Sequence, residues 1–115
     1  MKLSLDKLIE KIKMHPEIGM IACHLGIVRG YSKSGEPIKY LKVKYNRRAL
    51  IEIVNDLKRK PGIKEILVEI AEGERQIGEW IMVVLVAGDT REHTFLVLQQ
   101  LVDLIKKKVT EKEEY

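Results

Sequence analysis

The run Ile81–Ala87 is the feature of this sequence that most restricts the fold. Within it, Ile81–Val86 would place apolar side chains on both faces of a strand, which is typical of strands that are covered on both sides. The run is also much shorter than the ~20 residues needed to span a bilayer. We therefore expect it to form the central strand of a soluble domain.

The rest of the chain alternates between helical and strand-like patterns. Helical spacing of apolar residues predicts helices over 5–14, from Asn46 to Pro61-Gly62, and over 90–108. Alternating or β-rich stretches predict strands over 18–29, 38–45, 66–70 and 81–86. The first two strands are expected to form a long-looped hairpin and the last two a second pair, joined by a turn at 72–74.

Three residues are predicted to cap these helices. Ser4 and Asn46 precede the first two, and Asp89 precedes the third with Glu92 completing a capping box. The order of elements predicts an α+β fold with three helices over a mainly antiparallel sheet. A chain of 115 residues has room for one such domain, over residues 1–115.

Charge and composition limit the classes of function. The net charge of +4 suits an anionic ligand, but the six aromatic residues are too scattered to form a base-stacking platform. The single cysteine, Cys23, excludes an internal disulfide and a Cys-rich zinc site, and the three histidines show no metal-binding spacing. The charged N-terminal residues do not resemble a signal peptide, so we expect a cytoplasmic protein.

Two arginines are candidates for binding an anion. Arg29 ends a predicted strand between Gly26 and Gly30, where its guanidinium could meet a phosphate or carboxylate, or simply be solvated. Thr90 and Arg91 start the last helix, whose free N–H groups favour an anion unless neighbouring carboxylates occupy them.

The lysines Lys106, Lys107 and Lys108 end the same helix. A solvated basic turn that complements the helix dipole is one interpretation. A lysine desolvated beside a ligand, which could transfer protons or attack a carbonyl, is the other. His24 and Cys23 lie on an apolar strand and are interpreted as packed core residues.

Three segments taken in order resemble the large, catalytic subunit of molybdopterin synthase. They are Met20–Gly30, which ends Gly-Ile-Val-Arg-Gly; Gly73-x-x-x-Ile77-Gly78-Glu79; and Thr90-Arg91-x-x-x-Phe95 followed by Asp103-x-x-Lys106. The fifteen-residue gap from Arg91 to Lys106 is the one that this family keeps.

The resemblance implies a fold of the α/β-hammerhead type and a homodimer that binds a small ubiquitin-like sulfur carrier at each end, as a heterotetramer. The carrier ends in Gly-Gly and delivers sulfur as a C-terminal thiocarboxylate, which converts cyclic pyranopterin monophosphate to molybdopterin. Arg29 and Arg91 would bind the phosphate, Lys106 would be catalytic, and the backbone of Ile27 and Val28 would line the pocket. No cofactor, metal, nucleic acid or membrane is implied.

The sequence departs from the family pattern at three places. Thr90 replaces a substrate-binding histidine, Ile70-Ala71 replaces a His-Arg pair, and the second catalytic lysine falls on Glu113, with Lys112 one residue away. Three hypotheses therefore remain: a divergent synthase subunit, a catalytically weakened relative that keeps the dimer and its partner groove, and an unrelated basic binding module.

Three spatial expectations follow. The dimer contact should include apolar sheet residues of the second strand pair, because Ile81–Val86 offers more apolar surface than three helices need to cover. Arg29 and Arg91 should converge on one anion site. Lys106 should face that site while Lys107 and Lys108 are solvated. Because Arg91 and Lys106 would lie about 22 Å apart along one helix, Lys106 should meet Arg91 of a second subunit or serve the carrier's tail.

Overall fold

The computed structural model describes residues 2–115, and its central element is the strand β5 (Trp80–Gly88). It pairs antiparallel with β1 (Met20–Ile27) along one edge and with β3 (Ile63–Ile70) along the other, in the order β1-β5-β3. Every residue of β5 after Trp80 is buried. The predicted central, covered strand is thus confirmed, as is its pairing with the preceding strand.

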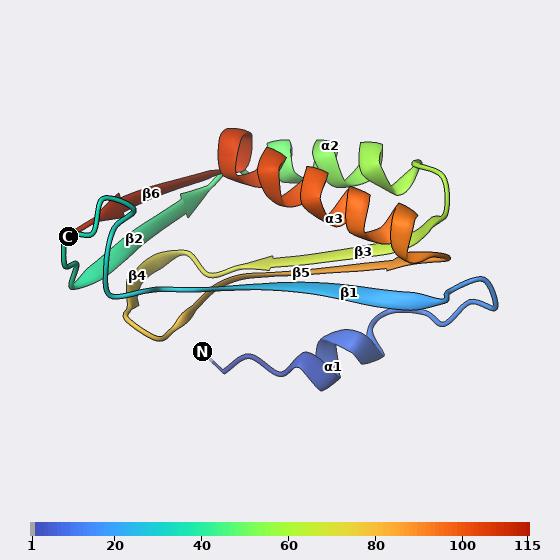
Figure 1. Cartoon of the computed structure of the whole chain (residues 1–115), viewed down its shortest axis with the longest axis horizontal. Helices are drawn as coiled ribbons and strands as arrows, with labels where there is room; N and C mark the ends of the chain where they lie inside the picture. The colour runs from blue at the N-terminus through green and yellow to red at the C-terminus, as the bar shows by residue number, and fades with distance from the viewer. Residues whose placement is uncertain (1) are drawn as a thin grey trace.

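Helices cover both faces of this sheet. Two of them, α2 (Arg47–Lys58) and α3 (Arg91–Leu104), lie over one face, and α1 (Leu5–Glu10) lies under the other (Figure 1). Alternation along β5 sends Val84 and Val86 toward α2 and α3, and sends Val83 and Leu85 toward α1. The caps Ser4 and Asn46 are confirmed, since each accepts a hydrogen bond from a backbone N–H of its helix.

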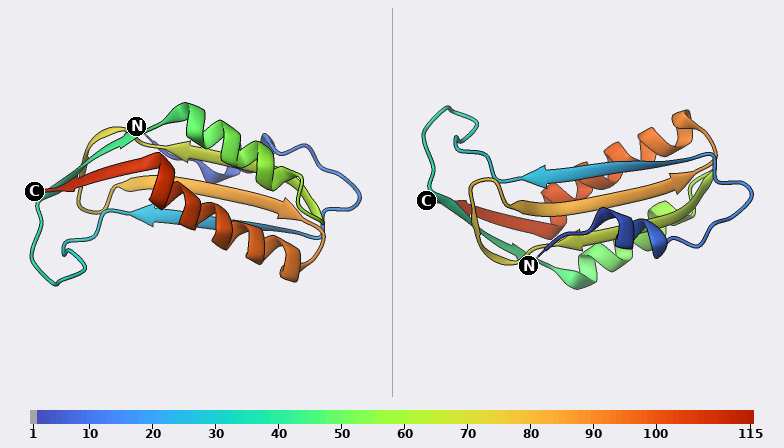
Figure 2. Two further views of the ribbon diagram at one scale, coloured as in Figure 1. Left: turned by 90° about the horizontal axis from the view of Figure 1, so that it is seen from above. Right: turned by 90° about the horizontal axis from the view of Figure 1, so that it is seen from below.

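A second sheet stands beyond one end of the first. It contains β2 (Tyr40–Tyr45), β4 (Gly73–Gln76) and β6 (Thr110–Glu114), in the order β4-β2-β6. Seen from above and from below, these strands extend the molecule to one side of the helices (Figure 2). The chain is therefore a single α+β domain with antiparallel pairing throughout.

The predicted hairpin of residues 18–29 and 38–45 is wrong. The first of these strands pairs with β5 and the second with β4 and β6, so the segment between them crosses from one sheet to the other. The two short strands of the second sheet, β4 and β6, were not predicted. Their sequences, Gly-Glu-Arg-Gln and Thr-Glu-Lys-Glu-Glu, have low intrinsic β-propensity, and the ladder with β2 makes them strands.

The last helix is shorter than predicted. It ends at Leu104 and continues as a π-helical turn, η1 (Ile105–Val109), that leads directly into β6. Its N-cap is Thr90 rather than Asp89, because the Thr90 hydroxyl accepts from the His93 N–H at 3.4 Å. Asp89 instead accepts from the N–H of Thr90 itself. No helix within residues 2–115 is long and apolar enough to cross a membrane.

The surplus of apolar surface expected on Ile81–Val86 as part of a dimer contact is not found. These side chains are at most 5% exposed within a single chain. The face expected to remain open is covered by Leu8 and Ile12 from α1 and the turn after it. The helix supplies the cover that the apolar run requires, so this run leaves no surface for a second subunit.

Replacement of Leu8 by Ala tests this role of α1. Leu8 is 6% exposed and packs with Val83, Leu85 and Ala87, so we expect the free energy of unfolding to fall by about 2–3 kcal/mol. Leu5 in the same helix is 37% exposed, and Leu5→Ala should cost only about 0.5 kcal/mol. Urea denaturation measures both. Equal losses would show that α1 does not seal the sheet.

Candidate functional site

A pocket of about 700 Å³ opens where the two sheets meet the end of α3. It is bounded by the end of β1 and the loop after it, by β2 and β6, and by η1. Its apolar wall is made by Ile38, Leu41, Ile81 and Met82. The volume is in the range of sites that hold small ligands.

The polar wall of the pocket is strongly basic. Arg29, Lys33, Lys106 and Lys112 line it, against one acidic residue, Glu114. Such an excess of positive charge at a concave surface attracts an anion, and an arginine can bind a phosphate or carboxylate with two hydrogen bonds. The structure therefore brings Arg29 and Lys106 together as predicted.

Strand alternation decides which residue of β6 enters the pocket. Thr110, Lys112 and Glu114 line it, whereas Glu113 accepts a hydrogen bond from the Tyr115 hydroxyl outside it. The lysine of this segment that faces Lys106 is thus Lys112. Partial burial, together with the charges of Lys106 and Lys33, lowers the pKa of Lys112 below its ordinary value.

Lys107 and Lys108 turn away from this pocket. Both are exposed, and they line a separate, smaller hollow of about 300 Å³ with Lys44 and Tyr45. This confirms the predicted split between Lys106 and its two neighbours, although a π-helical turn rather than an α-helix produces it.

His24 also lines the basic pocket, so its interpretation as a packed core residue is wrong. It pairs with Val84 of β5, and cross-strand partners share a face, so the imidazole points toward the α3 side of the sheet. The side chain is partly exposed. The only sign of this role in the sequence was the presence of a polar imidazole in a largely apolar strand.

The segment before Arg29 is held by the turn between β4 and β5. Val28 is buried, and its N–H and C=O bond to the backbone of Glu79 and Gly78 at 2.9 and 2.8 Å. Ile27 lines the pocket, but the backbone groups of Val28 are already occupied by this turn. Arg29 therefore follows directly on a residue whose backbone is fixed by hydrogen bonds.

Arg75 fixes the same turn from β4 and was missed by the sequence analysis. Its side chain is buried and donates to the Trp80 carbonyl from Nε at 3.0 Å and from Nη2 at 2.8 Å. The guanidinium also lies 5.5 Å from the centre of the Trp80 ring. No signal in the sequence pointed to this role, because Arg75 lies in a short polar segment and β4 itself was not predicted.

Thr90 and Arg91 lie at the opposite end of the sheet from the pocket. α3 begins beside the Gly88 end of β5, which pairs with the start of β1, whereas Arg29 follows the end of β1 (Figure 1). The predicted convergence of Arg29 and Arg91 is therefore wrong within one chain. Arg91 is exposed there, and the Thr90 hydroxyl is engaged as the helix cap.

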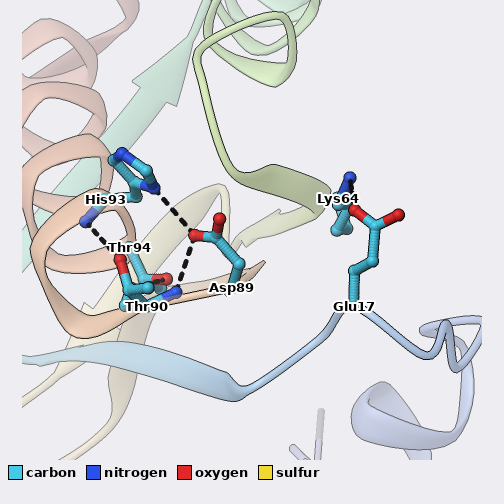
Figure 3. Close-up of polar contacts among 6 residues, drawn as sticks. All are labelled: Glu17, Lys64, Asp89, Thr90, His93 and Thr94. Carbon is cyan, nitrogen blue, oxygen red and sulfur yellow. Dashed lines mark hydrogen bonds and ion pairs between the residues drawn. The ribbon is translucent and has the colours of Figure 1, made fainter.

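A polar cluster fixes this start of α3 (Figure 3). Asp89 Oδ1 lies 2.8 Å from His93 Nδ1 and accepts from the Thr90 N–H, while the Thr94 hydroxyl donates to the Thr90 carbonyl. Gly62 has φ +78°, and a Cβ there would collide with Asp89 and His93. Packing against Gly62 and these hydrogen bonds therefore fix the start of α3, where Arg91 lies.

A family model described as MoaE protein matches residues 1–108. No curated protein sequence matches the chain.

Several solved structures share the fold. The X-ray structure of molybdopterin synthase from Staphylococcus aureus has a TM-score of 0.83 and 19% identity, covering 98% of this chain and 85% of that chain. Molybdopterin cofactor biosynthesis protein E from Burkholderia multivorans has a TM-score of 0.80 and 22% identity, covering 98% and 77%. A complex of subunits 1 and 2 of molybdopterin-converting factor from Helicobacter pylori has a TM-score of 0.69 and 16% identity, covering 95% and 70%.

The Asp89 cluster predicts a pH-dependent contribution to stability. The hydrogen bond with His93, followed by that from the Thr90 N–H, lowers the pKa of Asp89. Its stabilisation is therefore present above the unfolded pKa of about 3.9 and is lost as pH falls through the lower folded pKa. Asp89→Asn should reduce stability near neutral pH, and the deficit should shrink in acid. Denaturation curves over this pH range, with the exposed Glu10→Gln as control, measure it; a constant deficit would contradict the assignment.

Proposed function

The chain belongs to the MoaE protein family, and from this premise we propose that it is the catalytic subunit of a molybdopterin synthase in molybdenum cofactor biosynthesis. In this reaction it transfers sulfur from the C-terminal thiocarboxylate of a small subunit to cyclic pyranopterin monophosphate, in the cytoplasm. Because the family model covers nearly the whole chain, the hypothesis of an unrelated basic module is wrong.

The observation that carries the proposal is the meeting of Arg29, Lys106 and Lys112 in one pocket. Both reactants are anionic, one through its phosphate and the other through its thiocarboxylate. The basic wall suits both charges, and the apolar wall offers a surface for the pterin ring. The three basic residues come from separate elements, so only the folded chain assembles them.

Each basic residue has a role that fits its position. Arg29, which follows the fixed end of β1, binds the phosphate. Lys106 transfers the proton that sulfur transfer requires at the acyl group. Lys112, whose pKa is lowered by partial burial and by two neighbouring lysines, assists at the acyl carbon. This places the second lysine function on Lys112 rather than on Glu113.

The partner in this proposal is a small ubiquitin-like carrier that ends in Gly-Gly. The Helicobacter pylori neighbour is a complex of two subunits of molybdopterin-converting factor, and this chain shares the fold. We propose a homodimer with one carrier at each end. Since Arg91 is remote from the pocket of its own chain, it would serve the pocket of the second subunit.

One observation favours the alternative of a catalytically weakened relative. Ala71 is 3% exposed and Ile70 ends β3, so neither can act as a basic His-Arg pair would. Thr90 stands in place of a histidine, and its hydroxyl accepts the hydrogen bond that caps α3. An assay with thiocarboxylated carrier and cyclic pyranopterin monophosphate decides between the two functions.

Two neighbouring lysines give a matched test of the pocket. Lys106→Ala should lower the rate of molybdopterin formation by about 100-fold or more, as expected for loss of a proton-transferring group. Lys107→Ala should leave the rate nearly unchanged, because Lys107 lines a different hollow. Light scattering should give the same mass for both variants. Equal rates in the two variants would remove the catalytic role of Lys106.

Mixing two inactive variants tests whether Arg91 acts across the dimer. A Lys106→Ala chain still supplies Arg91, and an Arg91→Ala chain still supplies Lys106, so a mixed dimer contains one complete site. Random exchange puts about half of the chains into mixed dimers and should restore about a quarter of wild-type activity. If the mixture stays inactive after exchange has been verified by mass, Arg91 does not act in trans.

A further inference from the structure

His24 lines the basic pocket, and neither the family resemblance nor the proposed reaction gives it a role. It comes from β1 and lines the pocket together with apolar side chains and with Lys106 and Lys112. Burial, followed by the charges of Lys106 and Lys112, lowers its pKa, and no hydrogen bond from the described residues contributes to this shift. The ring is therefore neutral at physiological pH and faces the pocket without a hydrogen-bonded protein partner that would fix its charge.

Charged side chains line the pocket of His24 from three of the segments that bound it. Lys106 comes from η1, Lys112 and Glu114 from β6, and Arg29 and Lys33 from the segment that follows β1. β5 contributes only apolar side chains there, Met82 and, directly across the ladder, Val84. Four cations against one carboxylate leave a positive field at the imidazole, and this field opposes its protonation.

We propose that His24 is a proton-coupled ligand of this pocket: when a phosphate group enters among the lysines, the imidazole takes up a proton from solvent and donates a hydrogen bond to the anion. The bound anion cancels the field of the lysines and stabilises the imidazolium directly. The inference rests on the proposed function only in that a phosphate group enters this pocket.

Linkage fixes the sign of the effect. An anion that raises the pKa of His24 must itself bind more tightly when His24 is protonated, by the same factor. Affinity should therefore rise as pH falls through the pKa of His24 in the complex. A coupling of ordinary size makes affinity about 5-fold or more higher at a pH below the pKa of His24 in both the free and the bound protein than at pH 8.

The test uses the whole protein and sulfate, which stays dianionic throughout this pH range. Proton NMR follows the ring signals of all three histidines against pH, in sodium sulfate and in sodium chloride of equal ionic strength. We expect sulfate to raise the pKa of His24 more than chloride does, with smaller changes at His15 and His93, which lie outside the pocket. The chloride arm removes general screening of the lysines.

Variants assign the effect to the pocket. His24→Phe identifies the resonance, and His24→Gln, a neutral hydrogen-bonding replacement, should abolish the pH dependence of sulfate affinity measured by calorimetry. Lys106→Gln and Lys112→Gln should raise the pKa of His24 without sulfate and weaken the response to it. Lys107→Gln, outside the pocket, should behave as wild type.

The outcomes separate this inference from the proposed function. Equal effects of sulfate and chloride on His24, or unchanged pH dependence in His24→Gln, would overturn the role of His24 while leaving the pocket's enzymatic role intact. No sulfate binding at all would overturn the role of His24 together with the anion assignment of the pocket. The expected sulfate response without molybdopterin formation would uphold His24 and reject the synthase activity.

Discussion

The antiparallel pairing of β5 with both β1 and β3 is the interaction on which the rest of the structure depends. It removes both edges of an apolar strand from solvent, and α1 and the α2–α3 layer remove both faces. Burial of this one strand accounts for why three helices divide between two sides of the sheet. The length of β5 also separates the two arginines, because Arg91 lies beside the end of β5 and Arg29 lies beside its start.

The pocket is a consequence of where that sheet stops. After α3 the chain turns through η1 and enters β6, which is a strand of the second sheet. The corner left between the two sheets is lined by the turn, the strand and the end of β1. π-helical turns are uncommon and occur frequently at functional sites. Here the turn places Lys106 and Lys112 on the same side of the corner, and it sends Lys107 and Lys108 to the other side.

Sequence periodicity predicted the elements whose own side chains decide their structure. The two-sided apolar run and the apolar stripes of α2 and α3 belong to this class, as does the position of Lys106. The elements that were missed, β4 and β6, are polar and exist because β2 offers them a ladder. The hairpin failed for the same reason: the choice of partner strand depends on long-range pairing, which alternation within residues 38–45 does not encode.

The site was harder to predict than the fold because its members are individually ambiguous. His24 on an apolar strand and Arg75 within a short polar segment both have patterns that fit an ordinary core or surface residue. Their surroundings assign them different roles: Arg75 is buried against Trp80 and holds the turn beside Val28, whereas His24 lies beside two lysines at the open corner. The neighbouring lysines that lower the pKa of Lys112 also repel its charge, and this repulsion destabilises the free protein. Proteins retain such arrangements where a ligand relieves them. The concentration of like charge around His24 therefore indicates an anionic occupant more directly than any single residue of the pocket does.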